Sequence, residues 1–148
     1  MSSAFATLFG IGRFPYAPGT LASAVAIPLA WALAGLPAQY TLIAATVVVL
    51  ALGTLASDHY VRKTGIKDPG ACVIDELAGQ WAACCFAPRT VLAYPLCFLL
   101  FRIFDILKPW PISALEALPG GYGVMADDVV AGILAGAIVM LLFAWRIV

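Results

Sequence analysis

The chain has 148 residues, of which 64% are hydrophobic and only 11% are charged, and its mean hydropathy is +1.01. Average soluble domains are about 25% charged, so this composition is typical of an integral membrane protein rather than of a water-soluble globule. Eight basic and eight acidic side chains give a formal net charge of zero, which argues against a nucleic acid as partner. At this length we expect one domain, over residues 1–148.

Five apolar stretches, separated by glycine and proline clusters, follow one another along the chain. They cover Leu21–Leu36, Thr41–Ser57, Leu77–Ala87, Val91–Leu107 and Val129–Ile147. A membrane-spanning helix needs about 20 residues, and about 17 is the lower limit. The short third stretch can cross only if the residues before it join the helix, so a partial or re-entrant element is left open. The pattern predicts an all-α fold, a compact polytopic membrane helix bundle with four to five membrane segments.

The charged residues gather on one side of this predicted bundle. If the N-terminus is cytoplasmic and all five stretches cross, only Arg89 and Arg146 among the basic residues lie outside, in line with the positive-inside rule. The rule makes no demand on acids, yet all eight fall on the cytoplasmic side, which predicts a polar site at that face. These acids are Asp58, Asp68, Asp75, Glu76, Asp105, Glu116, Asp127 and Asp128.

The first polar patch, "GIGRFPYAPGTLAS", precedes the first apolar stretch. Its glycines and prolines predict no regular helix until after Gly19. Backbone N–H groups, the Thr20 and Ser23 hydroxyls and Arg13 could bind an anion where the first helix begins. The alternative is an ordinary loop, with Thr20 as helix N-cap and Arg13 as a topology anchor.

Two pairs of adjacent carboxylates stand before apolar stretches. Asp75 and Glu76 precede the third stretch, and Asp127 and Asp128 precede the fifth. Each pair could be explained as acids at a helix start, where they suit the helix dipole. Four cysteines, at positions 72, 84, 85 and 97, have no metal-ligand spacing and are predicted to be buried small hydrophobic residues.

The stretch "FRIFDILKPWPI" places Arg102, Asp105 and Lys108 three residues apart in an otherwise apolar segment. This spacing puts the three charges on one helix face, and Pro109 predicts that the helix ends at Lys108. An internal salt-bridge triad would be the alternative to a functional role. Five acids at one membrane face would repel one another, and a hard divalent cation such as Mg²⁺ would resolve this. Arg102, Lys108 and Arg13 would then supply the positive charge for a phosphate.

Four blocks of the sequence together resemble the phosphatidylglycerophosphatase A family, from about Gly10 to Gly136. They are "GxGxxPxAPGTxAS", "DPGxxVxDExxG", "FRxFDxxKPxPI" and "GGxGVMxDDxxAG". The resemblance implies a bacterial inner-membrane, multi-pass enzyme whose active site faces the cytoplasm. It implies hydrolysis of the terminal phosphate of phosphatidylglycerophosphate, giving phosphatidylglycerol and inorganic phosphate, with Mg²⁺ as cofactor. The Cys-x5-Arg loop and the DxDx[TV] pattern of other phosphatases are absent, and His59 is the one histidine.

From the resemblance and the residue chemistry we expect three overlapping groups of site residues. The catalytic group is Asp75, Asp105, Asp128 and Lys108; the Mg²⁺ ligands are Asp75, Glu76, Asp105, Asp127 and Asp128; the phosphate-binding group is Arg102, Lys108, Arg13, Gly19 and Thr20. Membrane lipids are the expected surroundings, and a homo-oligomer is left open. The alternatives are a small cation transporter or channel component using the acids as an ion path, and a non-enzymatic assembly subunit.

Overall fold

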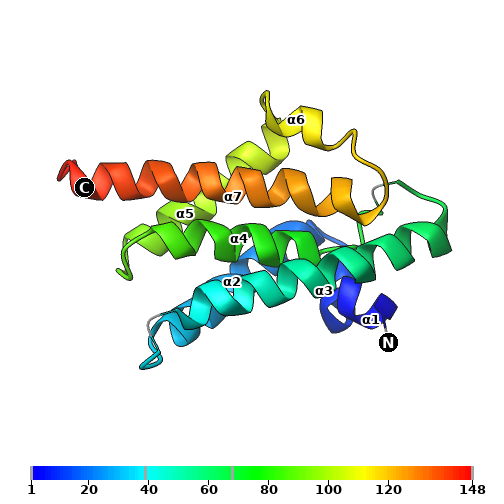
Figure 1. Cartoon of the computed structure of the whole chain (residues 1–148), viewed down its shortest axis with the longest axis horizontal. Coiled ribbons are helices and arrows are strands. Elements are labelled where there is room, and N and C mark those ends of the chain that lie inside the picture. The colour runs from blue at the N-terminus through cyan, green and yellow to red at the C-terminus, as the bar shows by residue number, and fades with distance from the viewer. Residues whose placement is uncertain (1, 39, 68, 148) are drawn as a thin grey trace.

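The computed structural model describes residues 2–38, 40–67 and 69–147, and these residues form helices and loops without a strand. The all-α prediction is therefore confirmed. Figure 1 shows the helices side by side as a bundle, with the short α6 at its margin. The elements are α1 (Ser2–Ala6), the 3-10 helix η1 (Leu8–Arg13), α2 (Pro18–Ala34), α3 (Thr41–Thr64), α4 (Ile74–Phe86), α5 (Ala93–Leu107), α6 (Ile112–Leu115) and α7 (Gly121–Ala144).

Helix α4 is the centre of the bundle, because it packs against α2, α3, α5 and α7. Its closest neighbour is α7, which it meets through small residues. A Cβ on Gly132 would collide with the Gly79 carbonyl, and one on Gly136 would collide with that of Ala83. The small-xxx-small pattern at 132–136 thus packs helices within the chain, as a close backbone approach requires.

Contacts around Trp31, near the C-terminal end of α2, join that helix to Arg89 and Tyr94. The Arg89 Nε donates to the Trp31 carbonyl at 3.1 Å, and the guanidinium carbon lies 4.5 Å from the indole ring centroid. The Tyr94 ring meets Trp31 edge-on, with centroids 5.4 Å apart. Closer to the middle, the Trp81 indole N–H donates to the Ala26 carbonyl at 3.0 Å and joins α4 to α2.

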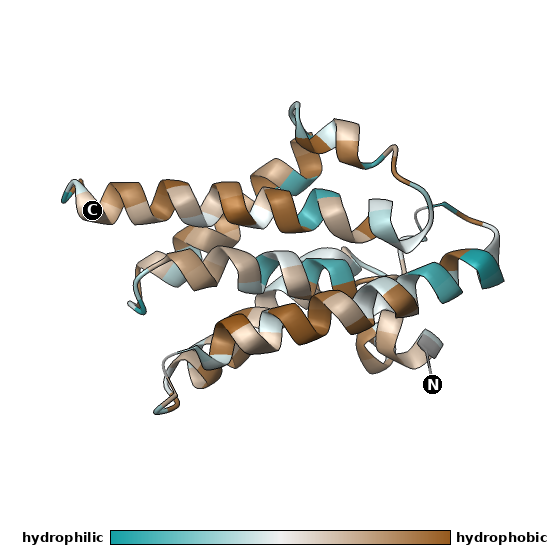
Figure 2. Cartoon of the chain, in the orientation of Figure 1, coloured by the Kyte–Doolittle hydropathy of each residue, from teal (hydrophilic) through white to brown (hydrophobic). Residues whose placement is uncertain are grey.

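Helix lengths bear on the predicted number of membrane segments. Helices α3 and α7, with 24 residues each, are long and apolar enough to cross a membrane, and α2 is a shorter apolar helix. Helix α4 has 13 residues, so it is about 20 Å long, against about 30 Å of hydrocarbon. Four to five crossing segments are therefore not confirmed. Figure 2 shows the hydrophilic parts of α3 and α7 toward the same end of the bundle.

The cysteines match their prediction, because Cys72, Cys84 and Cys97 are buried and Cys85 is partly buried. One predicted boundary is wrong. Helix α2 begins at Pro18 rather than after Gly19, because proline suits the first helical position, where its missing N–H has no intrahelical partner to lose.

Candidate active site

The candidate site lies at the end of the bundle opposite Trp31, where four helices present their polar ends. The N-terminal turns of α2 and α4, the C-terminal turns of α5 and the early turns of α7 contribute to it. Four sequence blocks that are far apart in the chain therefore supply side chains to one place.

Three carboxylates form the core of the site. One oxygen from each of Asp75, Glu76 and Asp128 can be chosen so that all lie within 4.8 Å of one another. Asp75 and Asp128 are only 6% and 4% exposed. The Glu76 N–H donates to Asp75 Oδ1 at 3.1 Å, which fixes the first turn of α4 beneath the cluster.

The two remaining predicted acids adjoin this core. Asp128 interacts electrostatically with Asp105 and Asp127 as well as with Glu76. The five acids Asp75, Glu76, Asp105, Asp127 and Asp128, called the carboxylate cluster below, thus share one buried to partly buried region, as the sequence predicts. Like charges at these separations repel strongly in a poorly solvated site, so the cluster requires compensating positive charge.

Two cations from α5 and its C-terminal end lie against the cluster. Arg102 Nη1 is 2.7 Å from Asp105 Oδ2, and Lys108 Nζ is 2.7 Å from Asp127 Oδ2. The alternative of a salt-bridge triad within α5 is therefore wrong for Lys108, which pairs with α7 instead. The cause is the predicted helix end: α5 stops at Leu107, and Lys108 takes a left-handed φ of 42° before Pro109.

The start of α2 approaches the cluster through its bare backbone. A Cβ on Gly19 would collide with Glu76 Oε1 and would stand 3.4 Å from Arg102 Nη1. Ser23 lies one turn later, where its hydroxyl donates to the Gly19 carbonyl at 2.9 Å and accepts from Arg102 Nη1 at 3.4 Å. The sequence indicated Ser23 only as an anion ligand, but in the structure it orients the guanidinium.

Arg13 and Thr20 are not joined to the cluster in the same way. Arg13 is exposed at the end of η1, and within the described ranges no acid forms an ion pair with it. Thr20 is not the helix cap that the alternative proposed, because the N-cap residue of α2 is Ala17. The expected phosphate-binding role of both residues remains a prediction.

The explanation that Asp127 and Asp128 are acids at a helix start is also wrong. Both were expected at a helix start, but α7 begins at Gly121, so they lie in its second turn. The Asp127 carboxylate is already paired with Lys108. Asp58, by contrast, belongs to no part of the carboxylate cluster. It pairs with Arg62 at 2.9 Å and accepts a hydrogen bond from the Gly121 N–H at 3.4 Å, so it joins α3 to the start of α7. Asp68 lies outside the described residues.

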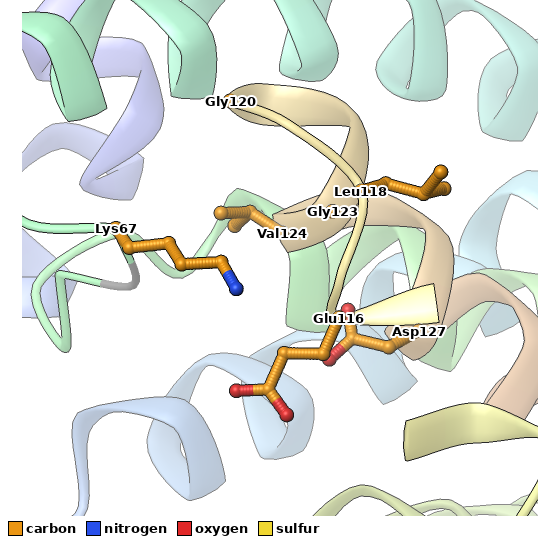
Figure 3. A pocket seen from close by; sticks show the side chains of 7 residues that line it. All are labelled: Lys67, Glu116, Leu118, Gly120, Gly123, Val124 and Asp127. Carbon is orange, nitrogen blue, oxygen red and sulfur yellow. The ribbon is translucent and has the colours of Figure 1, made fainter. Parts of the chain in front are cut away.

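A cavity of about 10 Å³, close to the volume needed for one water, adjoins Asp127. Figure 3 shows the Lys67 side chain reaching toward Glu116 and Asp127 across this space. Neither Lys67 nor Glu116 was assigned to the site from sequence. Each stands alone in a connecting segment, so spacing could not predict that Glu116, after α6, and Lys67, after α3, meet here.

The donor set suits a hard divalent cation. The core supplies carboxylate oxygens, which Mg²⁺ prefers. In addition, Glu76 Oε2 is buried and accepts no hydrogen bond from the described residues. A buried carboxylate oxygen without a partner is costly unless a ligand satisfies it, so the residues present fit such an ion.

The chain is similar in sequence to known proteins. A sequence model of the family described as phosphatidylglycerophosphatase A matches residues 4–143. The phosphatidylglycerophosphatase A of Escherichia coli K12 is 35% identical over 88% of this chain and 76% of its own length. The enzyme of the same name from Haemophilus influenzae is 34% identical over 94% of this chain and 86% of its own length.

A third relative carries a different name. A Bacteroides thetaiotaomicron protein, provisionally named as a phosphatidylinositol-3-phosphatase, is 38% identical over 86% of this chain and 84% of its own length. No solved structure matches the chain. From the family match and the two phosphatidylglycerophosphatase relatives, the chain belongs to the phosphatidylglycerophosphatase A family, and it is a phosphoric monoester hydrolase.

Proposed function

We propose that the chain removes the terminal phosphate of phosphatidylglycerophosphate, giving phosphatidylglycerol and inorganic phosphate, and that it requires Mg²⁺. The observation that carries the proposal is the buried carboxylate cluster with Arg102 and Lys108 beside it. Acids gathered at one end of a bundle, with cations at the same place, suit a metal and a phosphate group together.

Asp75, Glu76 and Asp128 are the residues that would hold the ion, with Asp105 and Asp127 adjoining them. When bound, Mg²⁺ would polarise a phosphate oxygen and make a bound water more acidic. The partnerless Glu76 Oε2 supports this assignment. The close approach of Gly19 to Glu76 leaves no room for a side chain between α2 and the cluster.

Arg102 is the proposed main contact to the phosphate. Its Nη1 forms an ion pair with Asp105 and donates a hydrogen bond to Ser23. Its Nε is buried and donates no hydrogen bond to the described residues. A buried guanidinium donor without an acceptor suits an anionic ligand. Lys108 would add a second positive charge as negative charge builds up on the phosphate oxygens.

The proposed reaction is direct attack by water on phosphorus. The water oxygen forms a bond to phosphorus while the bond from phosphorus to the glycerol oxygen breaks. A carboxylate of Asp75, Asp105 or Asp128 accepts the water's proton, and the leaving glycerol oxygen takes up a proton. The rival route is a covalent aspartyl-phosphate. Acid quenching during turnover of a ³²P-labelled substrate tests this, because labelled protein would refute direct attack.

The membrane setting is part of the proposal: a multi-pass protein of the bacterial cytoplasmic membrane with its site toward the cytoplasm. It is supported by the two long apolar helices. The outer surface of α3 also exposes large apolar side chains, namely Val47, Val48, Leu52 and Leu55. The grouping of the site residues at one end of the bundle fits a headgroup reached from one membrane face.

A cation transporter would be expected to distribute its acids along the bundle, whereas here they gather at one end. An assembly subunit would need no partnerless buried oxygen. The decisive assay is phosphate release by detergent-purified protein from phosphatidylglycerophosphate and, separately, phosphatidylinositol 3-phosphate, with Mg²⁺ or with chelator. We expect Mg²⁺-dependent release that is faster from phosphatidylglycerophosphate. No release from folded protein would reject the enzyme, and faster release from the inositol lipid would reject the substrate.

A further inference from the structure

An apolar groove lies between α2 and α5 on the outside of the bundle. It consists of two depressions, of about 330 and 240 Å³. Both are lined by Ile27, Pro28 and Pro95, so they form one continuous groove, called the α2–α5 groove below. Thr90 lines it as well and brings a hydroxyl to an otherwise apolar or aromatic wall.

The sequence explains why the two helices leave a gap here. Ala24 has a single methyl group, and proline rings at positions 28 and 95 stay close to their own helices, so none of the three reaches across. The proline inside α2 also removes one backbone hydrogen bond from that helix. A long side chain at these positions would fill the groove and stabilise the packing of α2 against α5. Packing alone therefore does not explain why the groove is there.

One end of the groove lies about one helical turn from the candidate active site. On α5, Arg102 lies four residues after the lining residue Phe98, and on α2, Ser23 lies four residues before Ile27. Residues four apart share a helix face, and Arg102 Nη1 donates to Ser23 Oγ at 3.4 Å. The groove therefore ends about one helical turn before Arg102, the cation that pairs with Asp105.

Trp31 lines the opposite end of the groove. This ring is held by the edge of Tyr94 and by the guanidinium of Arg89, so it forms a fixed wall. From Ser23 to Trp31 is eight residues of α2, or about 12 Å at about 1.5 Å per residue. The groove is thus an open apolar depression of limited length, with Trp31 at one end and the Arg102 cation one helical turn beyond the other.

We propose that the α2–α5 groove binds one acyl chain of the lipid substrate while the terminal phosphate of the same lipid lies at Arg102. This inference rests on the proposed function, and it adds that the enzyme recognises the lipid's tail and not only its headgroup. The favoured ligand is amphipathic: a glycerol, a phosphodiester and a second glycerol join its terminal phosphate to the acyl chains, and this linker would span the helical turn between Arg102 and the groove. A water-soluble phosphate ester without an acyl chain would bind at Arg102 and leave the groove empty.

The kinetic test uses a substitution that narrows the groove at the end nearer the active site. We expect Ala24→Phe to lower kcat/KM for long-chain phosphatidylglycerophosphate about tenfold relative to kcat/KM for its deacylated, water-soluble analogue, because the ring occupies the path of the chain. Ala51→Phe is the matched control: Ala51 is an exposed alanine on α3 that does not line the groove, so this ratio should stay at the wild-type value. An unchanged ratio in Ala24→Phe would overturn the inference.

A second measurement uses the wild-type protein and does not depend on turnover. Phosphatidylglycerophosphate with a diazirine on one acyl chain should label peptides from α2 and α5 on illumination, and excess unlabelled substrate should remove this labelling. Labelling of all lipid-facing helices without competition would overturn the inference even if phosphate is released. Competed labelling of α2 and α5 without phosphate release would support the groove and reject the proposed reaction.

Discussion

The substitution Gly19→Ala separates the geometry of the site from the stability of the fold. The added Cβ would collide with Glu76 Oε1, the far end of a flexible side chain. Glu76 must move its carboxylate by about 1 Å to restore ordinary contact, and misplacement of this size can cost about 100-fold in rate. Alanine has a better helix propensity than glycine by about 1 kcal/mol, so the free energy of unfolding should change by no more than that amount.

The assay is phosphate release from phosphatidylglycerophosphate over a range of Mg²⁺ concentrations, together with thermal unfolding. We expect kcat to fall about 100-fold and the half-activating Mg²⁺ concentration to rise, with an unfolding temperature near that of the wild type. Gly70→Ala is the matched control, because a Cβ there meets nothing within 4 Å. Wild-type turnover in folded Gly19→Ala would refute the claim that Glu76 must hold its position.

Three further predictions concern the metal, the guanidinium and the packing. Removal of divalent cations with a chelator should abolish phosphate release, and added Mg²⁺ should restore it; activity that survives chelation would exclude Mg²⁺ from the reaction. Arg102→Lys should lower kcat/KM about 10- to 100-fold, because lysine lacks the planar set of donors that serves Asp105, Ser23 and the phosphate; equal rates would remove Arg102 from the site. Gly132→Ala should lower the free energy of unfolding by about 1–3 kcal/mol in a chemical denaturation series, since its Cβ collides with the Gly79 carbonyl; an unchanged value would show that α4 and α7 can separate without cost.

The sequence predicted the members of the carboxylate cluster better than their pairing. Acids that adjoin apolar stretches must lie at the end of a bundle, so Asp75 and Asp128 could be placed together from the sequence. The partner of Lys108 could not be predicted in this way, because its left-handed backbone turns it toward α7 and Asp127. Ser23 was likewise seen as a ligand, whereas its distance to Arg102 depends on how α2 packs on α5.

Features that arise only from packing were not visible in the sequence. Lys67 and Glu116 meet Asp127 around a cavity because two connecting segments fold over the start of α7. The α2–α5 groove exists because small residues and prolines on two separate helices face each other. Apolar composition predicted every long helix, but four to five crossing segments are not confirmed, because only α3 and α7 are long enough by length and composition and α4 is a short, buried central helix.

The most direct test of the central claim compares two acids at the same end of the bundle. Asp128 belongs to the carboxylate cluster, whereas Asp58 lies outside the cluster and pairs with Arg62. Phosphate release from phosphatidylglycerophosphate with saturating Mg²⁺ should fall at least about 100-fold in Asp128→Asn and should stay near the wild-type rate in Asp58→Asn. Full activity in folded Asp128→Asn, or equal losses in both variants, would contradict a metal-assisted phosphatase site built on the carboxylate cluster.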